Sequence, residues 1–425
     1  MSNIRKIMNL LELMKSQWYS PDELRRIQEK KLRAIIKHCY EKIPLYHEKF
    51  KNNNIRPDEI KTIKDLTKIP YITKQEIQEN FPTRIVALNV NLNNCWISKT
   101  GGSTGTPLSM VYDKSAEDFE KSTALRPNIS CGQKIRDKWA VITNPSHVKS
   151  KKWFQYLQFF SPEYISIAKD TSSQIVDLNK FQPNIIDGFT SSIYLIAKEL
   201  DKQAHEHIHP NMIFTTSELI TKAEKNFIKS VFDADVFDQF GCVELGRTAW
   251  ECPSHQGYHI DVESVVMEFI KDDEQIESNE SGEIVYTGLY NYAMPLIRYK
   301  IGDIGTPSSE KCNCGRGLPL MSVIEGRKDD FLISNDGDKI SPRIIGEKFR
   351  NFEGVSNYKL IQQNKEEVKI LLVKNKNFVP TLEKMIKKEI CQTLGEKTIC
   401  IIEYPEEIPR EKSGKIRKII SKVNF

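Results

Sequence analysis

Residues 99–107 read KTGGSTGTP, a stretch that combines three glycines with four hydroxyl side chains and a closing proline. Glycine lets backbone N–H groups turn toward an anion and approach it closely. Serine and threonine add short, uncharged donors for phosphate oxygens. The pattern indicates a flexible loop that clamps a polyphosphate, and the alternative is a hydroxyl-rich surface turn. It is not a Walker loop, because no Gly-Lys-Ser/Thr ends it at the required spacing.

The composition is that of a globular protein with more than one domain. The chain has 425 residues, of which 39% are hydrophobic and 28% charged, enough for two or three domains with their own cores. A formal net charge of +5 is too small for this length to indicate nucleic-acid or membrane-surface binding. No apolar run approaches the length of a membrane span, and the N-terminal residues lack the apolar core of a signal peptide. We therefore expect a cytoplasmic protein whose nine cysteines are mostly reduced.

Residues 1–80 form the first of three regions that differ in hydrophobic pattern. Apolar residues recur there at helical spacing, as at Leu24, Ile27 and Ile35, and predict a helical start to the chain. From about residue 95 to residue 330, short apolar strands alternate with helices. This alternation predicts a layered α/β core with a largely parallel sheet.

Two further patterns indicate smaller subdomains. Residues 265–270 and 282–287 look like antiparallel strands, and they predict a β subdomain within the larger region. From about residue 331, strands at 354–361 and 368–373 precede an amphipathic helix that begins at Pro380. This order predicts a small α+β unit of ordinary domain size.

Two motifs in the α/β region carry carboxylates suited to binding a nucleotide. Phe240 and Gly241 precede Glu244, so an aromatic ring suited to stacking on a base stands near a carboxylate suited to a phosphate-bound metal. Asp303 follows a tight glycine turn and suits a pair of ribose hydroxyls. Each motif is only weakly specific by itself.

Two charged stretches lie in or beside the expected C-terminal unit. Residues 326–330 read GRKDD, at the boundary between the two regions, and residues 409–417 read PREKSGKIR, a basic loop near the end of the sequence. Taken alone, the first fits a solvated loop and the second an exposed basic turn.

In this order and at these distances, the glycine loop and the four later stretches resemble the adenylate-forming superfamily of acyl-CoA synthetases, adenylation domains and luciferases. Within it, the chain looks most like the phenylacetate–CoA ligase branch and its CapK-like relatives. That likeness rests on IPLY at 43–46, TSE at 216–218, GYHI at 257–260, and DG followed by ISP between 336 and 342. The resemblance spans nearly the whole chain. It implies a large N-terminal adenylation domain, residues 1–328, and a small mobile C-terminal α+β domain, residues 329–425.

The resemblance also implies a role for each motif in joining a carboxylate to ATP. Lys415 would bridge the carboxylate and the α-phosphate, and Glu244 would hold Mg²⁺. Phe240 would line the adenine site, and Asp303 would bind the ribose. Asp329 would be the hinge about which the C-terminal domain rotates. The other implied nucleotide-binding positions are Thr100, Gly101, Gly102, Ser103, Thr104, Gly105, Ser217, Glu218, Gly241 and Arg327.

Two positions depart from the pattern of that family. Val243 stands before Glu244, where threonine or serine is common, so one hydroxyl near the phosphates is lost. Lys300 and Ile301 stand where Arg-Thr often precedes the ribose-binding Gly-Asp. Neither change removes a charged group with an implied role, so we expect activity.

Four residues, Cys252, His255, Cys312 and Cys314, make a candidate structural zinc site, since three thiolates and one imidazole are a tetrahedral donor set. Their spacing is not that of a standard zinc finger, but members of the phenylacetate–CoA ligase-like branch often carry a similar cluster. His259 is a rival ligand, and four unrelated residues are the alternative.

The function that the resemblance implies is ATP-dependent activation of a small carboxylic acid to an acyl-adenylate, followed by thioester formation with CoA. One alternative keeps the adenylation but passes the acyl group to a carrier-protein thiol or to an amine on a sugar. A second alternative is a non-catalytic nucleotide-binding scaffold, which the presence of Lys415, Glu244 and Asp303 disfavours. The implied cofactors are ATP, Mg²⁺, CoA and Zn²⁺, and a homodimer is common in this branch.

Overall fold

The computed structural model describes residues 2–100, 107–145, 148, 151, 153–202, 208–349, 352–411 and 413–423. By packing, the chain divides into two units, each assembled from two separate segments. Unit 1 contains residues 1–134 and 237–324, and unit 2 contains residues 135–236 and 325–425.

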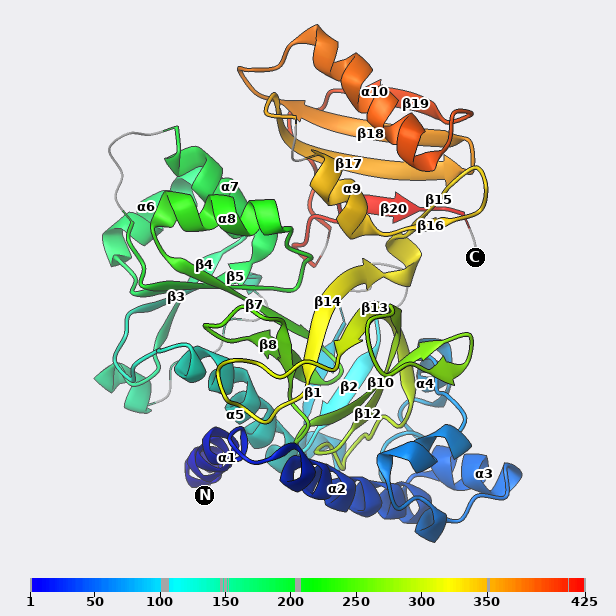
Figure 1. Ribbon diagram of the computed structural model, residues 1–425. Coiled ribbons are helices and arrows are strands. Elements are labelled where there is room, and N and C mark those ends of the chain that lie inside the picture. The colour runs from blue at the N-terminus through cyan, green and yellow to red at the C-terminus, as the bar shows by residue number, and fades with distance from the viewer. Residues whose placement is uncertain are drawn as a thin grey trace. The chain divides into compact units, whose positions relative to one another are not determined.

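Helices form the first part of unit 1, as their hydrophobic spacing predicted (Figure 1). They are joined by short 3₁₀ turns, and the N-terminal helix packs along the last of the set. The elements are α1 (Ser2–Ser16), α2 (Pro21–Lys42), α3 (Pro44–Asn52), η1 (Pro57–Glu59), η2 (Ile63–Lys68), α4 (Lys74–Asn80), η3 (Leu92–Asn94) and α5 (Lys114–Ser130).

The start of α2 follows from its local sequence. The Ser20 hydroxyl accepts a hydrogen bond from the backbone N–H of Glu23, and the Glu23 carboxylate accepts one from the backbone N–H of Ser20. Pro21 occupies the first turn, where its missing N–H is not needed. The buried face then repeats at helical spacing, for example at Leu24, Leu32 and Ile35, and packs into the body of unit 1.

Strand pairs of unit 1, such as β10 with β12 and β12 with β13, are antiparallel, as predicted for the β subdomain. The first two, β1 (Trp96–Lys99) and β2 (Ser109–Tyr112), form a hairpin. The other strands follow the order β11-β10-β12-β13-β14-β9-β8-β7. Their bounds are β7 (Asp235–Cys242), β8 (Gly246–Glu251), β9 (Tyr258–Ile260), β10 (Val265–Lys271), β11 (Glu274–Gln275), β12 (Gly282–Gly288), β13 (Tyr299–Ser308) and β14 (Leu320–Arg327).

The first segment of unit 2 is the parallel α/β layer that the alternating pattern predicted. Its strands run in the order β6-β5-β3-β4, and each neighbouring pair is parallel. Its helices lie beside these strands in Figure 1 and share one hydrophobic core with them. The elements are β3 (Trp139–Thr143), η5 (Trp153–Leu157), β4 (Pro162–Ser166), α6 (Thr171–Phe181), β5 (Ile185–Phe189), α7 (Thr190–Leu200), β6 (Met212–Thr216) and α8 (Lys222–Phe232).

The second segment of unit 2 has a core of its own, formed by residues between Leu332 and Ile419. Its sheet has the order β19-β18-β17-β20 and mixes antiparallel with parallel pairs, which confirms the predicted α+β character. The elements are η6 (Lys328–Asp330), β15 (Leu332–Ile333), β16 (Lys339–Ile340), α9 (Pro342–Phe349), β17 (Val355–Asn364), β18 (Glu367–Lys374), α10 (Pro380–Leu394), β19 (Ile399–Glu403) and β20 (Ile419–Ser421).

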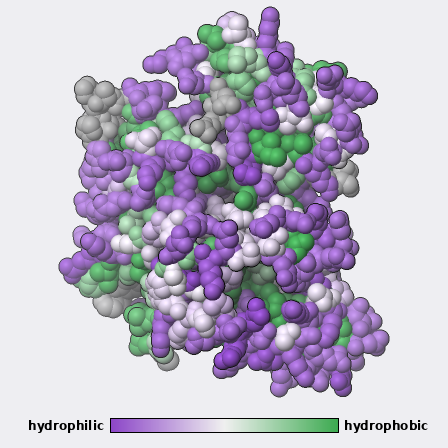
Figure 2. Space-filling view, viewed as in Figure 1, coloured by the Kyte–Doolittle hydropathy of each residue, from purple (hydrophilic) through white to green (hydrophobic). Residues whose placement is uncertain are grey.

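The expected domain boundary between residues 328 and 329 stays a prediction. It falls within η6, directly before the second core of unit 2 begins at Leu332. The face in Figure 2 is mostly hydrophilic, with small apolar patches between charged side chains. Within the described ranges, no helix is both long and apolar enough to cross a membrane.

Candidate active site and metal cluster

The β1–β2 hairpin closes both ends of the glycine-rich loop. The backbone N–H of Thr100 donates to the carbonyl of Leu108 at 2.9 Å, and the Thr100 hydroxyl accepts from the N–H of Leu108 at 2.8 Å. The predicted phosphate-binding residues Gly101, Gly102, Ser103, Thr104 and Gly105 lie outside the described residues. The structure therefore defines the two flanking residues of the loop, Thr100 and Leu108, which are hydrogen-bonded to each other.

Glu244 is held from two sides by tyrosines of unit 1. The Tyr112 hydroxyl, from β2, donates to the main-chain carbonyls of Val243 and Glu244, each at 2.8 Å. The Tyr299 hydroxyl, from the start of β13, donates to the Glu244 carboxylate at 3.2 Å. Only 5% of Glu244 is exposed. In such a buried environment a carboxylate attracts a bound cation more strongly than it would in water.

Glu244 and Asp303 share one neighbourhood. Burial, followed by the charges of these two carboxylates, raises the pKa of the Cys242 thiol well above its usual range. Burial and the same two charges also raise the pKa of the Tyr286 hydroxyl. Asp303 is itself 7% exposed, so unit 1 gathers two largely buried carboxylates that the sequence analysis had assigned to metal and ribose.

Phe240 and Gly241 lie at the end of β7, where the strand turns toward Glu244. Phe240 pairs with Ala249 of β8, and the register shifts at Gly241. A Cβ at Gly241 would stand 2.3 Å from the carbonyl oxygen of Gly246, so the close approach of β7 and β8 requires glycine there. The half-buried Phe240 ring therefore lies next to a position where only glycine fits between the two strands.

Lys415 lies in unit 2, in a loop held by hydrogen bonds on both sides of the lysine. The backbone N–H of Glu411 donates to the Lys415 carbonyl at 2.9 Å, and the N–H of Ile416 donates to the Glu218 carboxylate at 2.6 Å. Arg410 donates to the carbonyl of Gly414 at 2.9 Å. The half-buried Lys415 therefore starts from a defined backbone.

The expected hinge residue, Asp329, lies in η6 at the start of the second segment of unit 2. Its carbonyl accepts a hydrogen bond from Arg417 at 3.4 Å, and the neighbouring Asp330 carboxylate pairs with the same arginine. Burial raises the pKa of Asp330 to about 6, against the opposing charges of Arg417 and Arg327. Arg327, an expected nucleotide-binding residue, ends β14 just before this turn.

The candidate metal cluster forms with one change of ligand. Ligand atoms of Cys252, His259, Cys312 and Cys314 all lie within 4.8 Å of one another. The predicted ligand His255 is not among them, and that prediction was wrong. Its ring stacks on Phe237, with centroids 5.1 Å apart, and its backbone takes a left-handed φ of 49°.

The geometry of this cluster fits a tetrahedral metal. The sulfurs of Cys252 and Cys312 are 3.6 Å apart, and His259 Nε2 is 3.4 Å from the Cys314 sulfur. In a tetrahedron, zinc–ligand bonds of about 2.0–2.3 Å place neighbouring ligands roughly 3.3–3.8 Å apart. Burial, followed by the charge of Arg316, lowers the pKa of His259 to about 4, so its imidazole is neutral as a metal ligand requires.

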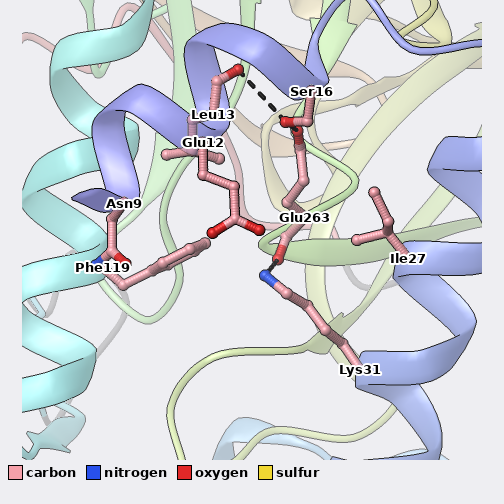
Figure 3. Close-up of a pocket in the computed structure, with 8 residues that line it drawn as sticks. All are labelled: Asn9, Glu12, Leu13, Ser16, Ile27, Lys31, Phe119 and Glu263. Atoms are coloured by element: carbon pink, nitrogen blue, oxygen red, sulfur yellow. Dashed lines mark hydrogen bonds between the residues drawn. The ribbon is translucent and has the colours of Figure 1, made fainter. Parts of the chain in front are cut away.

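A small cavity in unit 1 is a separate feature (Figure 3). Its volume of about 20 Å³ suits one water molecule and no larger ligand. Lys31 crosses it to donate to the carbonyl of Glu263 at 2.7 Å, and Ser16 donates to the Glu263 carboxylate at 2.5 Å. The cavity thus belongs to the contacts that hold α1 and α2 in place, and its lining residues are Asn9, Glu12, Leu13, Ser16, Ile27, Lys31, Phe119 and Glu263.

Two features of the site escaped the sequence analysis. The choice of His259 over His255 depends on strand pairing, because His259 lies on β9 opposite Leu320 of β14, which leads back to the loop of Cys312 and Cys314. The contact of Glu218 with the Lys415 loop joins residues 198 positions apart. Neither has a local sequence signal, although His259 was already a rival ligand.

The comparisons with known proteins agree with this architecture. Residues 332–422 match the family model of the CapK C-terminal domain. The chain is 26% identical to Protein CapK of Staphylococcus aureus over 416 residues, which cover 95% of this chain and 90% of that protein. It is also 26% identical to the phenylacetate-coenzyme A ligase of Escherichia coli K12 over 356 residues, which cover 81% of this chain and 80% of that enzyme.

A solved structure supports the fold. The crystal structure of 2-hydroxyisobutyryl-CoA ligase, in the postadenylation state with 2-HIB-AMP, matches with a TM-score of 0.77 at 17% identity. The match covers 95% of this chain and 90% of that one. The layered α/β core and the small C-terminal α+β part therefore share the fold of that ligase. The homologues of this chain thus include Protein CapK and phenylacetate-coenzyme A ligases, and its C-terminal part matches the CapK C-terminal domain.

Proposed function

We propose that this protein activates a small carboxylic acid with ATP, forming an acyl-adenylate and pyrophosphate, and then transfers the acyl group to the thiol of CoA. The relatives include phenylacetate-coenzyme A ligases from several bacteria, which supports an acid and a CoA thioester as substrate and product classes. ATP and CoA are accordingly the expected cosubstrates.

The single observation that carries the proposal is the gathering of buried carboxylates beside the β1–β2 hairpin. Tyr112, on the strand that leaves the glycine-rich loop, binds the main chain of Glu244. Glu244 and Asp303 together influence the same buried thiol at Cys242. Two carboxylates in a dry site suit a bound cation and a hydroxyl-rich ligand, and a metal nucleotide supplies both.

The chemistry assigns each residue a task in the first half-reaction. A carboxylate oxygen of the acid attacks the α-phosphorus of ATP, the bond to the bridging oxygen breaks, and pyrophosphate leaves with its electron pair. Lys415 neutralises the oxygens that crowd around the α-phosphorus, because its ammonium is a compact charge on a flexible stem. Glu244 would hold Mg²⁺, which would offset phosphate charge, while Asp303 orients the ribose and Phe240 lines the adenine site.

The proposed domain division is residues 1–328 and residues 329–425, with Asp329 as the hinge. The separate core from Leu332 to Ile419 and the family match from residue 332 support this division. A hinge at η6 would let the C-terminal domain carry Lys415 into and out of the adenylation site. In the second half-reaction the CoA thiolate attacks the acyl carbon, and AMP leaves.

We also propose that Cys252, His259, Cys312 and Cys314 hold one structural zinc ion. Four protein ligands would leave no open position for a substrate, which suits structure better than catalysis. Cys252 follows β8 and His259 lies on β9, so the metal would fasten β9 to β8, which pairs with the Phe240 strand, β7.

Exchange of labelled pyrophosphate into ATP, measured with a panel of aryl, fatty, amino and hydroxy acids, tests the proposed function. We expect exchange with one acid class and stoichiometric AMP formation when CoA is added. Exchange without CoA consumption would move the acceptor to a carrier-protein thiol or a sugar amine. If no acid supports exchange while ATP still binds, the proposed enzyme activity is wrong and a nucleotide-binding scaffold is the better interpretation.

A further inference from the structure

The Glu218 carboxylate joins two parts of unit 2 that are far apart in sequence. One oxygen accepts from the backbone N–H of Ser191 at 2.7 Å, and the other accepts from the Ser191 hydroxyl at 3.1 Å. This second oxygen also accepts from the backbone N–H of Ile416 at 2.6 Å. Ser191 lies in the first turn of α7, and Ile416 directly follows Lys415. Because the acceptor is charged, these are strong hydrogen bonds.

The backbone around Glu218 is set to aim this carboxylate. Ser217, which follows β6, has a left-handed φ of 71°, an uncommon conformation for a residue with a side chain. The carbonyl of Glu218 accepts from the Thr190 hydroxyl at 3.2 Å. Main chain and side chain of Glu218 are therefore both anchored to the start of α7.

The Lys415 loop is shaped to receive this contact. Arg410 donates to the Ser191 hydroxyl at 3.2 Å as well as to the carbonyl of Gly414, so it lies on the same anchor as Glu218. Gly414 has a left-handed φ of 89° and packs so closely that a Cβ there would stand 1.8 Å from Ile167 Cδ1. The loop thus seats on the α/β layer at the residue just before Lys415 and at the residue just after it.

The contacts of Glu218 argue against direct binding of nucleotide. A carboxylate has about four acceptor positions, and three are already taken by donors of this protein. A metal or a ribose would have to displace them. The geometry instead leads from Glu218 through the Ile416 amide to the backbone of Lys415.

We propose that Glu218 is a positioning residue for Lys415, which docks the lysine loop during acyl-adenylate formation and has no task in acyl transfer to the thiol. The proposal rests on the function proposed above. The positioning role goes beyond that function in two ways. It makes one side chain matter for adenylation and not for acyl transfer, and it gives Glu218 a role other than nucleotide binding.

The test compares Glu218→Gln with Glu199→Gln, an exchange of the same kind at an α7 residue that pairs with Lys202. In Glu218→Gln, one acceptor oxygen becomes a donor amide facing N–H groups, so we expect kcat for pyrophosphate exchange to fall about 30-fold. The affinity for ATP and the rate of CoA acylation from supplied acyl-adenylate should stay within about 2-fold of wild type. Glu199→Gln should leave all three unchanged.

Hydrogen–deuterium exchange of the backbone amides of residues 413–418, measured without substrates, tests directly whether the lysine loop is docked. We expect faster exchange in Glu218→Gln than in the wild type and in Glu199→Gln. This measurement needs no enzyme activity, so a wild type without pyrophosphate exchange would defeat the proposed function and leave the docking still tested.

Three results would overturn the positioning role. They are unchanged pyrophosphate exchange in Glu218→Gln, an equal loss in both half-reactions, and a weakened affinity for ATP that accounts for the whole effect. If Glu218→Gln does not fold, Ser191→Ala decides, because it removes one donor to Glu218 and one acceptor for Arg410. We expect Ser191→Ala to lower pyrophosphate exchange about 5-fold and to spare acyl transfer, and unchanged exchange there would contradict the proposal.

Discussion

Glu244 and Lys415 are the two charged residues with the largest proposed roles, and the protein holds them in different ways. Glu244 lies in unit 1, is 5% exposed, and is fixed by the hydroxyls of Tyr112 and Tyr299. Lys415 lies in unit 2, is half-buried, and is held through its neighbours by the side chains of Glu218 and Arg410.

The difference lies in the elements that supply the contacts, because strand residues hold Glu244 and loop residues hold the backbone around Lys415. Tyr112 and Tyr299 belong to paired strands, and this pairing fixes the backbone from which each tyrosine reaches Glu244. The Ile416 amide belongs to a loop, so its hydrogen bond to Glu218, worth about 1.5–3 kcal/mol, can break without disrupting a sheet. We call the strand-held surroundings of Glu244 the persistent side and the loop around Lys415 the releasable side.

The largest effect is expected at the releasable side. Lys415→Ala should lower carboxylate-dependent pyrophosphate exchange about 1000-fold, because the charge on the α-phosphate loses its nearest counter-charge. ATP affinity should change little. Lys422→Ala, at an exposed lysine of the same segment, is the control. A rate near wild type in Lys415→Ala would remove this lysine from the mechanism.

The metal cluster tests whether the persistent side depends on zinc. The purified protein should contain about one zinc per chain, and His259→Ala should lose it together with roughly 3 kcal/mol of unfolding free energy. His255→Ala should keep the metal, since that ring stacks on Phe237 instead. Elemental analysis and chemical denaturation measure both quantities. Zinc lost in His255→Ala but kept in His259→Ala would reverse the assignment.

The charge of Glu244 is the next test of the persistent side. Glu244→Gln should lower exchange about 100-fold and raise the Mg²⁺ concentration needed for half-maximal rate, because an amide is a weaker ligand for this cation. Tyr299→Phe, which removes only the hydrogen bond to the carboxylate, should cost no more than about 3-fold. An unchanged Mg²⁺ requirement in Glu244→Gln would mean that the metal is held elsewhere.

The smallest expected effect concerns the seat of the lysine loop. Gly414→Ala should lower exchange about 10-fold, because the added methyl meets Ile167 and the left-handed backbone disfavours alanine. Gly337→Ala is a matched control, since Gly337 also has a left-handed φ, 96°, but nothing lies within 4 Å of its added Cβ. Equal rates in the two variants would show that close packing at residue 414 does not matter.

Much of the fold could be predicted from local pattern. The helix from Pro380 to Leu394, the parallel strands before residue 237 and the antiparallel strands after residue 264 were predicted from hydrophobic spacing, and the structure confirms them. These elements bury one face or a continuous apolar run, so their sequence carries the period of their structure. The short strands β4 and β8 were not predicted, because they are set by their neighbours in the sheet.

The candidate site residues show the same contrast between local sequence patterns and contacts between distant segments. Motifs whose residues are adjacent in sequence, such as Phe240 with Glu244, could be recognised because their geometry is local. His259 and the Glu218 contact depend on which distant segments meet. A histidine four residues from the correct one looked equally suitable until β9 was paired with β14.

The division of unit 2 into two segments has a consequence for protein synthesis. Glu218 leaves the ribosome 198 residues before its partner Ile416, a delay of roughly 10 to 40 s at ordinary rates of elongation. During that time the α/β layer must wait with the surface that later receives the C-terminal segment uncovered. That surface presents charged groups such as Glu218, Glu224 and Lys198, which water solvates well. These charged groups keep part of the waiting surface hydrated, while Ile167 stays uncovered until the segment with Gly414 is made and packs against it.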